Sequence, residues 1–317
     1  MTEDAVKYIE KSFLAPLIGN DMVTDISYNG ESLYYVDNRY GRRKSDISVS
    51  GEDAMSFLRQ IANLTEKSIN TSNPILDVSF GRYRLNGINL SIGRHKTKKA
   101  PSFSLRIASI SCKIEKDPQF MDEMAKKVLV DILDKRRSIV IGGQTGTGKT
   151  ELQKWCLLNL PKNSRVVVLD NVEELDLLAI DSIDMTTWMA GENGTKNSLN
   201  VLIKNVLRHN PDYLIVAEAR GEEMLEALAS SGSGHPLITT IHAENLSSMP
   251  HRLARMALMA NANITMSELM EEVEATIPYY VYLRREMSED GSIKRYLQSI
   301  GHYHNKEMEI LYERGKR

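Results

Sequence analysis

The sequence has little cysteine and no long apolar run, and each shortage excludes a class of protein. Its two cysteines, Cys112 and Cys156, form no CxxC pair and have no neighbouring pattern of metal ligands, which excludes a disulfide framework or a cysteine zinc site. No segment approaches the roughly 18 consecutive apolar residues of a membrane-spanning helix. The N-terminus carries acidic residues where a secretory signal would be basic. We therefore expect a protein that stays in the reducing cytoplasm.

An excess of charge of either sign is also missing. The formal net charge is -2, which argues against a uniformly basic nucleic-acid-binding protein but is compatible with a local basic surface. Hydrophobic residues make up 42% and charged residues 26% of the chain, so a folded core is expected rather than disorder. Because single cores usually stop growing near about 250–300 residues, 317 residues predict two domains.

Residues 1–112 are predicted to form an α+β domain. Helices are expected over residues 6–17 and over GEDAMSFLRQIANLTEKS (51–68). Strand patterns occur in DISYNGESLYYVD, PILDVSFGRYRLNGINLSI and SFSLRIAS, and the Asn-Gly pair at 86–87 predicts a turn. The polar segment 113–123 is the expected linker.

Residues 124–317 are predicted to form an α/β domain. Apolar strand-like runs alternate with helical patterns, which predicts a parallel sheet flanked by helices. The runs are SIVIGG (138–143), RVVVLD (165–170), YLIVAE (213–218) and LITTIH (237–242). Helices are expected over 149–160, 197–209, 221–230 and 247–260, an exposed loop over 189–197, and a final hairpin over IPYYVYLRRE and SIKRYLQSIG.

The stretch GQTGTGKT has the GxxxxGK[ST] spacing directly after one predicted strand and directly before a predicted helix. Its glycines let backbone N–H groups wrap around phosphates, and the helix N-terminus adds its positive end. Lys149 is expected to reach the β and γ phosphates, and Thr150 to hold Mg²⁺. The predicted nucleotide-binding residues are Gly143, Gln144, Thr145, Gly146, Thr147, Gly148, Lys149 and Thr150.

A phosphate-binding loop alone does not separate kinases, GTPases, transporters and helicases, so the other strand ends matter. Ligands of open α/β sheets bind beyond the carboxyl ends of the strands, which predicts Asp170, Glu218 and His242 on the same edge as the loop. Glu218 is our first candidate for orienting an attacking water. A helix N-cap is the alternative interpretation of Asp170 and Glu218, and a packing role is the alternative for His242.

This set of motifs resembles the secretion ATPases that power type II and type IV secretion, type IV pili and Tad pili. The similarity covers nearly the whole chain: the P-loop, an acidic "Asp box" VLDNVEEL, a Walker B region LRHNPDYLIVAEARGEE and a "His box" SGHPLITTIHAEN. In the N-terminal half, DMVTDISYNG, PILDVSFGRYRLNGI and SFSLRI resemble the type IV secretion and Tad branch.

The resemblance implies a smaller N-terminal α+β domain joined by a linker to a RecA-like P-loop ATPase domain with a mostly parallel sheet. It implies a ring of six chains that binds ATP and Mg²⁺ and uses domain closure to power a secretion, conjugation or pilus-assembly machine. The implied location is cytoplasmic, peripheral to the membrane. The implied partners are membrane-embedded platform proteins, with the inner-membrane surface as a further candidate and no direct DNA binding required.

The resemblance also assigns site residues. Glu218 is the implied Walker B glutamate and, with Thr150, a ligand of Mg²⁺ bound through ATP. The other candidates are Asp170 and Glu173 in the Asp box, Arg84 and Arg106 in the N-terminal domain, Arg208 and Arg220 beside Walker B, and His235 and His242 in the His box. Guanidinium groups suit the task because they stabilise the charge on transferring phosphoryl oxygens, with structural ion pairs as the alternative for the arginines.

Three residues depart from the family pattern: Ala217 before the glutamate, Ser233 in the His box and Leu169 before the Asp-box aspartate. They leave the phosphate grip intact and keep open a nucleotide-gated scaffold with little turnover. A RecA-like nucleic-acid motor is the other alternative. The near-neutral charge and the lack of an aromatic-basic strand channel count against that motor.

Further features are less specific. Glu151, directly after the loop, is interpreted as a favourable acidic residue in the first helical turn. His302 and His304 share a predicted strand face, but no third metal ligand is evident nearby, which favours ordinary surface histidines. The basic runs GRRK (41–44) and RHKTKK (94–99) match either solvated loops or a surface that meets membrane phosphates.

Overall fold

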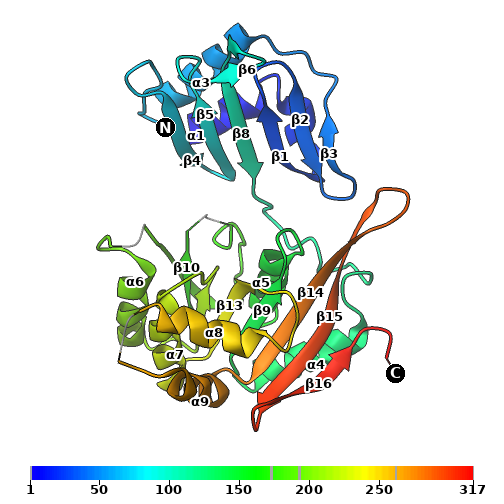
Figure 1. The fold of residues 1–317 in the computed structure, drawn as a ribbon, viewed down its shortest axis with the longest axis vertical. Helices are drawn as coiled ribbons and strands as arrows, with labels where there is room; N and C mark the ends of the chain where they lie inside the picture. The colour runs from blue at the N-terminus through cyan, green and yellow to red at the C-terminus, as the bar shows by residue number, and fades with distance from the viewer. Residues whose placement is uncertain (1, 172–173, 192–193, 261–262, 317) are drawn as a thin grey trace. The chain divides into compact units, whose positions relative to one another are not determined.

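The computed structural model describes residues 2–171, 174–191, 194–260 and 263–316. The chain divides into two compact units, Met1–Ile110 with Met287–Ile293, and Ser111–Glu286 with Lys294–Arg317 (Figure 1). Residues 111–122, which overlap the predicted linker, form no helix or strand and belong to the second unit. Within the described residues, no helix combines the length and the apolar character needed to cross a membrane.

The first unit is built on a six-stranded sheet in the order β3-β2-β1-β8-β5-β4, whose neighbouring strands pair antiparallel. Its strands are β1 (Val23–Tyr28), β2 (Leu33–Asp37), β3 (Gly41–Lys44), β4 (Ile75–Phe80), β5 (Tyr83–Ile88) and β8 (Ser102–Ile107), with a separate ribbon of β6 (Arg94–His95) and β7 (Lys98–Lys99). Its helices are α1 (Thr2–Glu10), α2 (Ala15–Ile18) and α3 (Gly51–Leu64).

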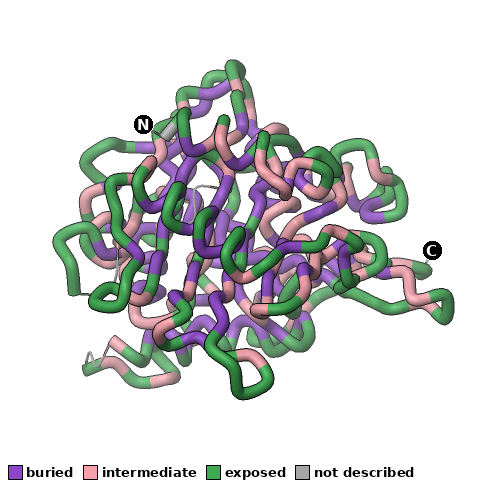
Figure 2. Tube along the Cα trace, turned by 90° about the horizontal axis from the view of Figure 1, so that it is seen from above, coloured by how far each residue is buried: buried purple, intermediate pink, exposed green. Residues whose placement is uncertain are grey.

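One face of this sheet is packed and the other is open. Buried and exposed residues alternate along β4, β5 and β8, as the period of two of a half-buried strand requires. Helices α1 and α3 contact each other and β4, and thus cover the packed face (Figure 1). Figure 2 shows the resulting mixture of buried and exposed segments along the chain.

Helix α3 confirms the helix expected over 51–68, although it ends earlier, at Leu64. The side chain of Ser50 accepts a hydrogen bond from the Asp53 backbone N–H, and the Asp53 carboxylate accepts one from the Ser50 backbone N–H. This capping box satisfies N–H groups that a helix start leaves open.

The turn predicted at Asn86–Gly87 is wrong, because both residues lie inside β5. Phe80 pairs with Tyr83, so the chain turns at residues 81–82 instead. Gly87 has a packing role: a Cβ there would lie 2.5 Å from Cδ2 of Leu58 on α3. The glycine therefore allows helix and sheet to approach closely, rather than marking a turn.

The second unit is an α/β fold around an eight-stranded mixed sheet in the order β11-β10-β12-β13-β9-β14-β15-β16. Pairing from β11 to β14 is parallel, and β15 pairs antiparallel with β16. The strands are β9 (Ile139–Gly143), β10 (Arg165–Asp170), β11 (Asp184–Met189), β12 (Tyr213–Val216), β13 (Leu237–His242), β14 (Tyr279–Met287), β15 (Ile293–His304) and β16 (Glu307–Glu313).

Helices cover both faces of this sheet (Figure 1). They are α4 (Glu123–Asp134), α5 (Lys149–Leu158), α6 (Leu199–Val206) with the 3₁₀ turn η1 (Leu207–His209), α7 (Glu223–Gly232), α8 (Met249–Leu258) and α9 (Met266–Thr276). One apolar core joins Ile139 and Ile141 to Leu129 of α4 and Leu152 of α5. The other contains Val140 together with residues of α7, α8 and α9. Continuous apolar strands such as β9 are typical of a sheet buried on both sides.

The sequence pattern predicted the central strands and missed the periphery. The four apolar runs form β9, β10, β12 and β13, and helices lie close to the expected ranges. The final hairpin strands are confirmed as β14 and β15. We did not anticipate α4, β11, α9 or β16, which flank or extend the central layer.

Candidate functional site

The loop that follows β9 has a backbone conformation that requires glycine. Gly146 and Gly148 have φ angles of +75° and +95°, values that side chains disfavour. A Cβ on Gly143 would lie 2.7 Å from Oγ1 of Thr147 and 2.8 Å from the carbonyl oxygen of Leu283. The Thr147 hydroxyl donates to the Gln144 carbonyl, which closes the turn. The glycines are therefore required by the shape of the loop.

Lys149 is the first residue of α5 and is largely buried beneath the loop. Its Nζ atom lies 3.2 Å from the carbonyl oxygens of both Gly143 and Gln144. Burial lowers the pKa of Lys149, opposed by the attraction of Glu218. The ammonium group is thus held at the centre of the loop, next to the N-terminus of a ten-residue helix.

Three further charged or titratable residues continue from Lys149. Its Nζ lies 3.5 Å from Nδ1 of His242, whose Nε2 lies 2.9 Å from Oε1 of Glu218. Arg220 donates to Oε2 of Glu218 at 2.6 Å. We call this row of Lys149, His242, Glu218 and Arg220 the charged row. Although Oε1 of Glu218 is close to His242, it makes no hydrogen bond of normal geometry among the described residues, so that contact is electrostatic.

The parallel strands explain why the charged row forms. His242 pairs with Gly143 in register, so the end of β13 lies beside the start of the loop. Val216 at the end of β12 pairs with Thr239, and the Ala219 N–H donates to the Thr240 carbonyl. The carboxyl ends of neighbouring parallel strands therefore meet at one edge, where α/β sheets bind ligands.

The pKa of His242 is lowered, first by burial and then by the positive charge of Lys149. Glu218 acts in the opposite direction but is outweighed. Burial and the charge of Lys149 therefore favour the neutral imidazole, whose Nδ1 lies toward Lys149 and whose Nε2 lies toward Glu218.

Asp170 ends β10 and is fully buried. Its Oδ2 accepts hydrogen bonds from the backbone N–H groups of Glu174 and Leu175 at 2.9 and 3.0 Å. No helix lies between β10 and β11 among the described residues, so these bonds order the chain after the strand and are not the helix N-cap that we considered as the alternative. Glu173, the other Asp-box candidate, lies outside the described residues.

Two candidates lie at the opposite, amino edge of the sheet. His235 precedes β13 and is separated from His242 by the whole strand. Arg208 lies in η1, before β12 begins, and is exposed. The structure therefore does not bring His235 or Arg208 to the charged row.

Comparison with known proteins identifies the family to which this chain belongs. Residues 97–278 match the model of the family described as "Type II/IV secretion system protein". The chain belongs to this family. The resemblance to secretion ATPases of the type IV branch is thereby confirmed.

Individual relatives of this secretion-family chain have names and folds consistent with that family. It is 25% identical over 286 residues to a putative conjugal transfer protein of Mycobacterium tuberculosis, covering 86% of this chain and 80% of that protein. It is 24% identical over 234 residues to the type IV secretion system protein VirB11 of Bartonella henselae, covering 62% and 65%. The X-ray structure of the Legionella pneumophila ATPase DotB has the same fold, with a TM-score of 0.66 at 18% identity, covering 92% and 80%.

Two residues of the secretion-family chain reach the loop and were missed by sequence reasoning. Arg295 on β15 donates from Nε to the Gly146 carbonyl at 2.7 Å. Arg285 on β14 lies near the same glycine, with NH1 3.6 Å from the position of a Gly146 Cβ. No local pattern marks these arginines, because the contact joins distant parts of the sequence.

Glu223 was also missed. Its Oε1 accepts from the backbone N–H groups of Arg220 and Gly221 at 2.5 and 3.0 Å. Because Glu223 is buried, these bonds fix the turn that carries Glu218 and Arg220. The GEE sequence carried a usable signal, since a carboxylate at the start of a helix commonly accepts backbone N–H groups.

Glu151 has more contacts than a first-turn charge requires. Its Oε2 accepts from the Lys113 backbone N–H at 2.6 Å, and its Oε1 lies 3.3 Å from Nζ of the buried Lys154. The side chain thus ties residues 111–116 to the helix that begins at Lys149.

The two N-terminal arginines lie side by side in the first unit. Arg84 on β5 and Arg106 on β8 are direct cross-strand partners, so they share one face, and both are about half exposed. Arg84 lies 3.7 Å from Asp77 and Arg106 lies 3.6 Å from Asp25. Exposed ion pairs at such distances are weak.

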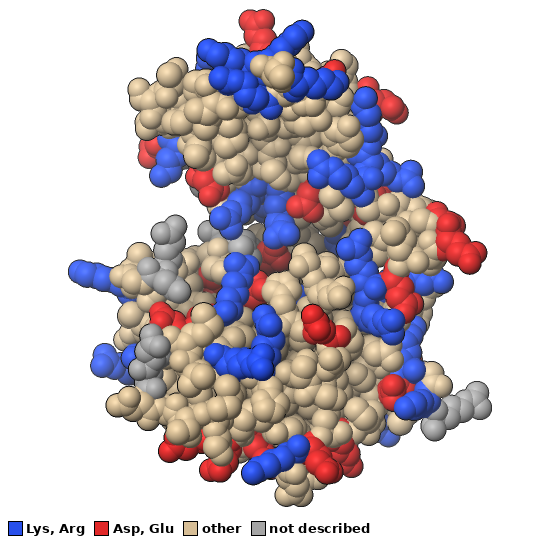
Figure 3. Space-filling model, in the orientation of Figure 1, with Lys and Arg blue, Asp and Glu red and all other residues tan. Residues whose placement is uncertain are grey.

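A second basic region covers the ribbon β6–β7. Arg94, Lys96, Lys98 and Lys99 are exposed there, and Figure 3 shows Lys and Arg side chains gathered over this end of the first unit. His95 and Lys96 both contact Glu31, which neutralises part of the charge. The run RHKTKK is therefore a partly neutralised surface ribbon.

Proposed function

We propose that this chain is an Mg²⁺-dependent ATPase that powers a type IV secretion or conjugation machine. The observation that carries the proposal is the charged row beside the glycine loop, since it puts a lysine and a carboxylate at the same edge of the sheet. Family membership supports the secretion context, and the relatives named for conjugal transfer and type IV secretion support that branch.

The donor set of the loop fits a nucleoside triphosphate. Backbone N–H groups around Gly146 and Gly148, the N-terminus of α5 and the Lys149 ammonium group together offer several donors and a concentrated positive charge. ATP supplies the phosphoanhydride bond that is broken. Thr150 and Glu218 are the residues that would hold Mg²⁺.

Glu218 is suited to orient the attacking water. Arg220 donates to its Oε2, and His242 faces its buried Oε1, so these two residues hold the carboxylate in place and one contact must open to admit the water. His242 lies between Glu218 and Lys149, and so would respond to charge at the phosphate end of the row. We assign His242 to sensing rather than base catalysis, because its ring lies between the Lys149 ammonium group and Glu218.

The assembly we propose is a ring of six chains with RecA-like ATPase domains. Arg84 and Arg106 would reach phosphate when the two units close, and His235 and Arg208 would serve contacts between neighbouring chains. The basic ribbon β6–β7 would face the inner-membrane surface near the platform proteins of the machine.

The test is steady-state phosphate release by the purified full chain, with its mass in solution measured with and without nucleotide. We expect Mg²⁺-dependent turnover that Lys149→Ala abolishes, and a sixfold assembly with ATP. Turnover unaffected by Lys149→Ala would overturn the site. Tight ATP binding without turnover would favour the scaffold alternative, and DNA-stimulated turnover the nucleic-acid motor.

A further inference from the structure

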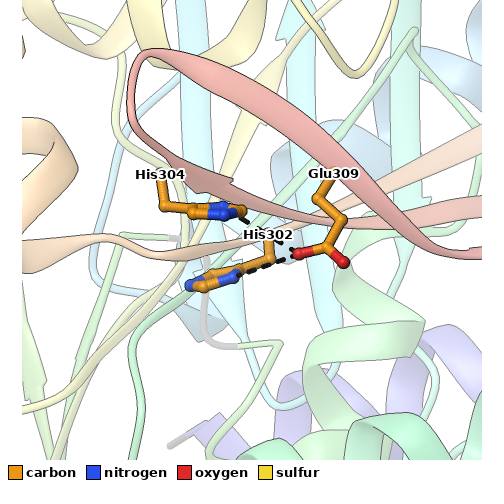
Figure 4. Close-up of side chains that lie close together, drawn as sticks. All are labelled: His302, His304 and Glu309. Atoms are coloured by element: carbon orange, nitrogen blue, oxygen red, sulfur yellow. Dashed lines mark ion pairs between the residues drawn. The ribbon is translucent and has the colours of Figure 1, made fainter.

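A cluster of metal-ligating side chains lies on the last hairpin of the second unit. His302 and His304 on β15 and Glu309 on β16 point toward one another (Figure 4). One ligand atom from each lies within 4.8 Å of the other two, and no other group of this kind occurs among the described residues. The sequence indicated the histidine pair but not Glu309, which comes from across the turn.

The hairpin geometry explains the convergence. His302 and His304 share one strand face, whereas Tyr303 between them is buried on the other. Residues 305–306 form the turn with φ angles of +50° and +63°, as a tight two-residue hairpin requires. The resulting register pairs His302 with Glu309 and therefore puts that carboxylate on the face of the histidines.

Aromatic stacking orients the two imidazole rings. His302 stacks on Tyr279, with ring centroids 4.9 Å apart, and His304 stacks on His302 at 4.7 Å. Both Nδ1 atoms face Oε2 of Glu309, at 3.8 and 3.9 Å. The Nδ1 atom of His304 is inaccessible to solvent and has no hydrogen-bond partner among the described residues. A buried ring nitrogen without a partner needs an explanation, and a shared ion supplies one.

The distances suit an ion better than direct hydrogen bonds. At 3.8 and 3.9 Å the nitrogen–oxygen separations exceed the hydrogen-bond range. With metal–ligand bonds of about 2.0–2.1 Å, two ligands of one tetrahedral zinc ion lie roughly 3.3 Å apart. Because the two rings lie within 17° of parallel, sharing an ion requires the imidazoles to tilt out of their stack and the carboxylate to rotate. The carboxylate is 57% and the His304 side chain 45% exposed, so both can move.

We propose that His302, His304 and Glu309 bind one divalent ion of the zinc type. Two imidazole nitrogens and one carboxylate favour zinc and related transition ions over Mg²⁺ and Ca²⁺, which prefer oxygen ligands. Three protein ligands leave a fourth position for water. Since β16 is an edge strand of the eight-stranded sheet, the ion would join that edge to β15 and stabilise the hairpin.

The test uses untagged, chelator-treated full chain without nucleotide, titrated with Zn²⁺ in a calorimeter. We expect one ion per chain and a higher melting temperature with Zn²⁺. His304→Gln and Glu309→Gln should each weaken binding by about tenfold or more, since even residues that only support a ligand cost that much. Co²⁺ should give the visible absorption of a low-coordinate site in the wild type, and lose it in both variants.

Matched controls separate the site from general metal affinity. His95→Gln removes a histidine that also contacts a carboxylate, and Glu313→Gln removes a carboxylate from the same strand β16. Both should bind Zn²⁺ as the wild type does, and melting curves without metal confirm that every variant is folded. Absence of saturable binding in the wild type would refute the proposal. So would Zn²⁺ affinity equal to that of the wild type in His304→Gln and Glu309→Gln.

Discussion

Residues of the same sequence motifs lie at both the carboxyl and the amino edge of the second sheet, but among the described residues only those at the carboxyl edge contact one another. At the carboxyl edge, Lys149, His242 and Glu218 form a continuous row. At the amino edge, His235 and Arg208 are isolated from that row. A motif read along the sequence can therefore span a whole strand, and β13 divides the His box between two ends of the molecule's sheet. Proximity in sequence does not imply a shared chemical role.

Among substitutions at the two edges, Lys149→Ala at the carboxyl edge should have the largest effect on ATP turnover. Removing the ammonium group held by the Gly143 and Gln144 carbonyls takes away the main charge opposite phosphate, so we expect ATP turnover to fall by about a thousandfold. Phosphate release and binding of a fluorescent nucleotide measure it. Lys154→Met is a poor control because that lysine is buried against Glu151; Lys204→Ala, an exposed lysine paired with Glu226, should leave turnover unchanged.

Glu218→Gln should lower turnover by roughly a hundredfold or more while nucleotide binding is retained, because the amide keeps the size of the side chain but cannot act as a base. Single-turnover hydrolysis and equilibrium binding separate the two effects. Glu226→Gln on α7 is the matched control and should behave as the wild type. Equal loss of binding and hydrolysis in Glu218→Gln would assign the residue to phosphate binding instead.

Arg295→Ala should have an intermediate effect. Its loss frees the Gly146 carbonyl and loosens the loop, so nucleotide affinity should weaken about tenfold, a loss in the range for a charged hydrogen bond. Arg284→Ala, whose Nε contacts Glu286, changes the same hairpin without touching the loop. Identical affinities in the two variants would show that the Arg295 contact does not order the loop.

The contribution of His242 to the pH dependence of the free energy of unfolding should be smaller than the effects above. Because its pKa is lowered in the folded chain, the unfolded chain binds more protons at acid pH, and the free energy of unfolding falls as pH drops below about 6.5. His242→Gln removes this contribution, so its melting temperature should decline less between pH 7 and pH 5. The effect is limited by the 43% exposure of the side chain. A steeper decline in the variant would contradict the direction of the shift.

The smallest effect on nucleotide affinity belongs to the amino edge. His235→Ala and Arg208→Ala should leave nucleotide affinity unchanged within about twofold, because neither residue contacts the row and surface substitutions are usually near neutral. Any loss of activity should appear in the mass of the assembly. A tenfold loss of affinity in a monomeric His235→Ala sample would erase the distinction between the edges.

The central layer of the second unit could be predicted because its signals are local. Apolar runs flanked by helical periodicity mark buried parallel strands, and the glycine spacing marks the loop whose φ angles demand glycine. Together with the rule that ligands bind at the carboxyl edge, these signals predicted that Glu218 and His242 lie beside Lys149, as the structure shows.

What failed depended on contacts between distant residues. Arg295 reaches Gly146 only because β14 and β15 extend the sheet beside β9, an arrangement that no local pattern encodes. The Asn-Gly pair at 86–87 resembles a turn signal in the sequence, whereas in the structure Gly87 allows close packing against Leu58. Glu309 joins His302 only through the hairpin register. Assignments of Arg84, Arg106 and Glu173 stay predictions.

The position of β9 in its sheet also determines the order in which the chain can mature on the ribosome. All six strands of the first sheet lie within the first 107 residues, so that sheet can close early. Strand β9 instead lies between β13 and β14 and gains no neighbour until residues 237–242 and then 279–287 have been synthesised. Its apolar surface and unpaired backbone stay exposed for that interval, and such unpaired strands are prone to aggregation.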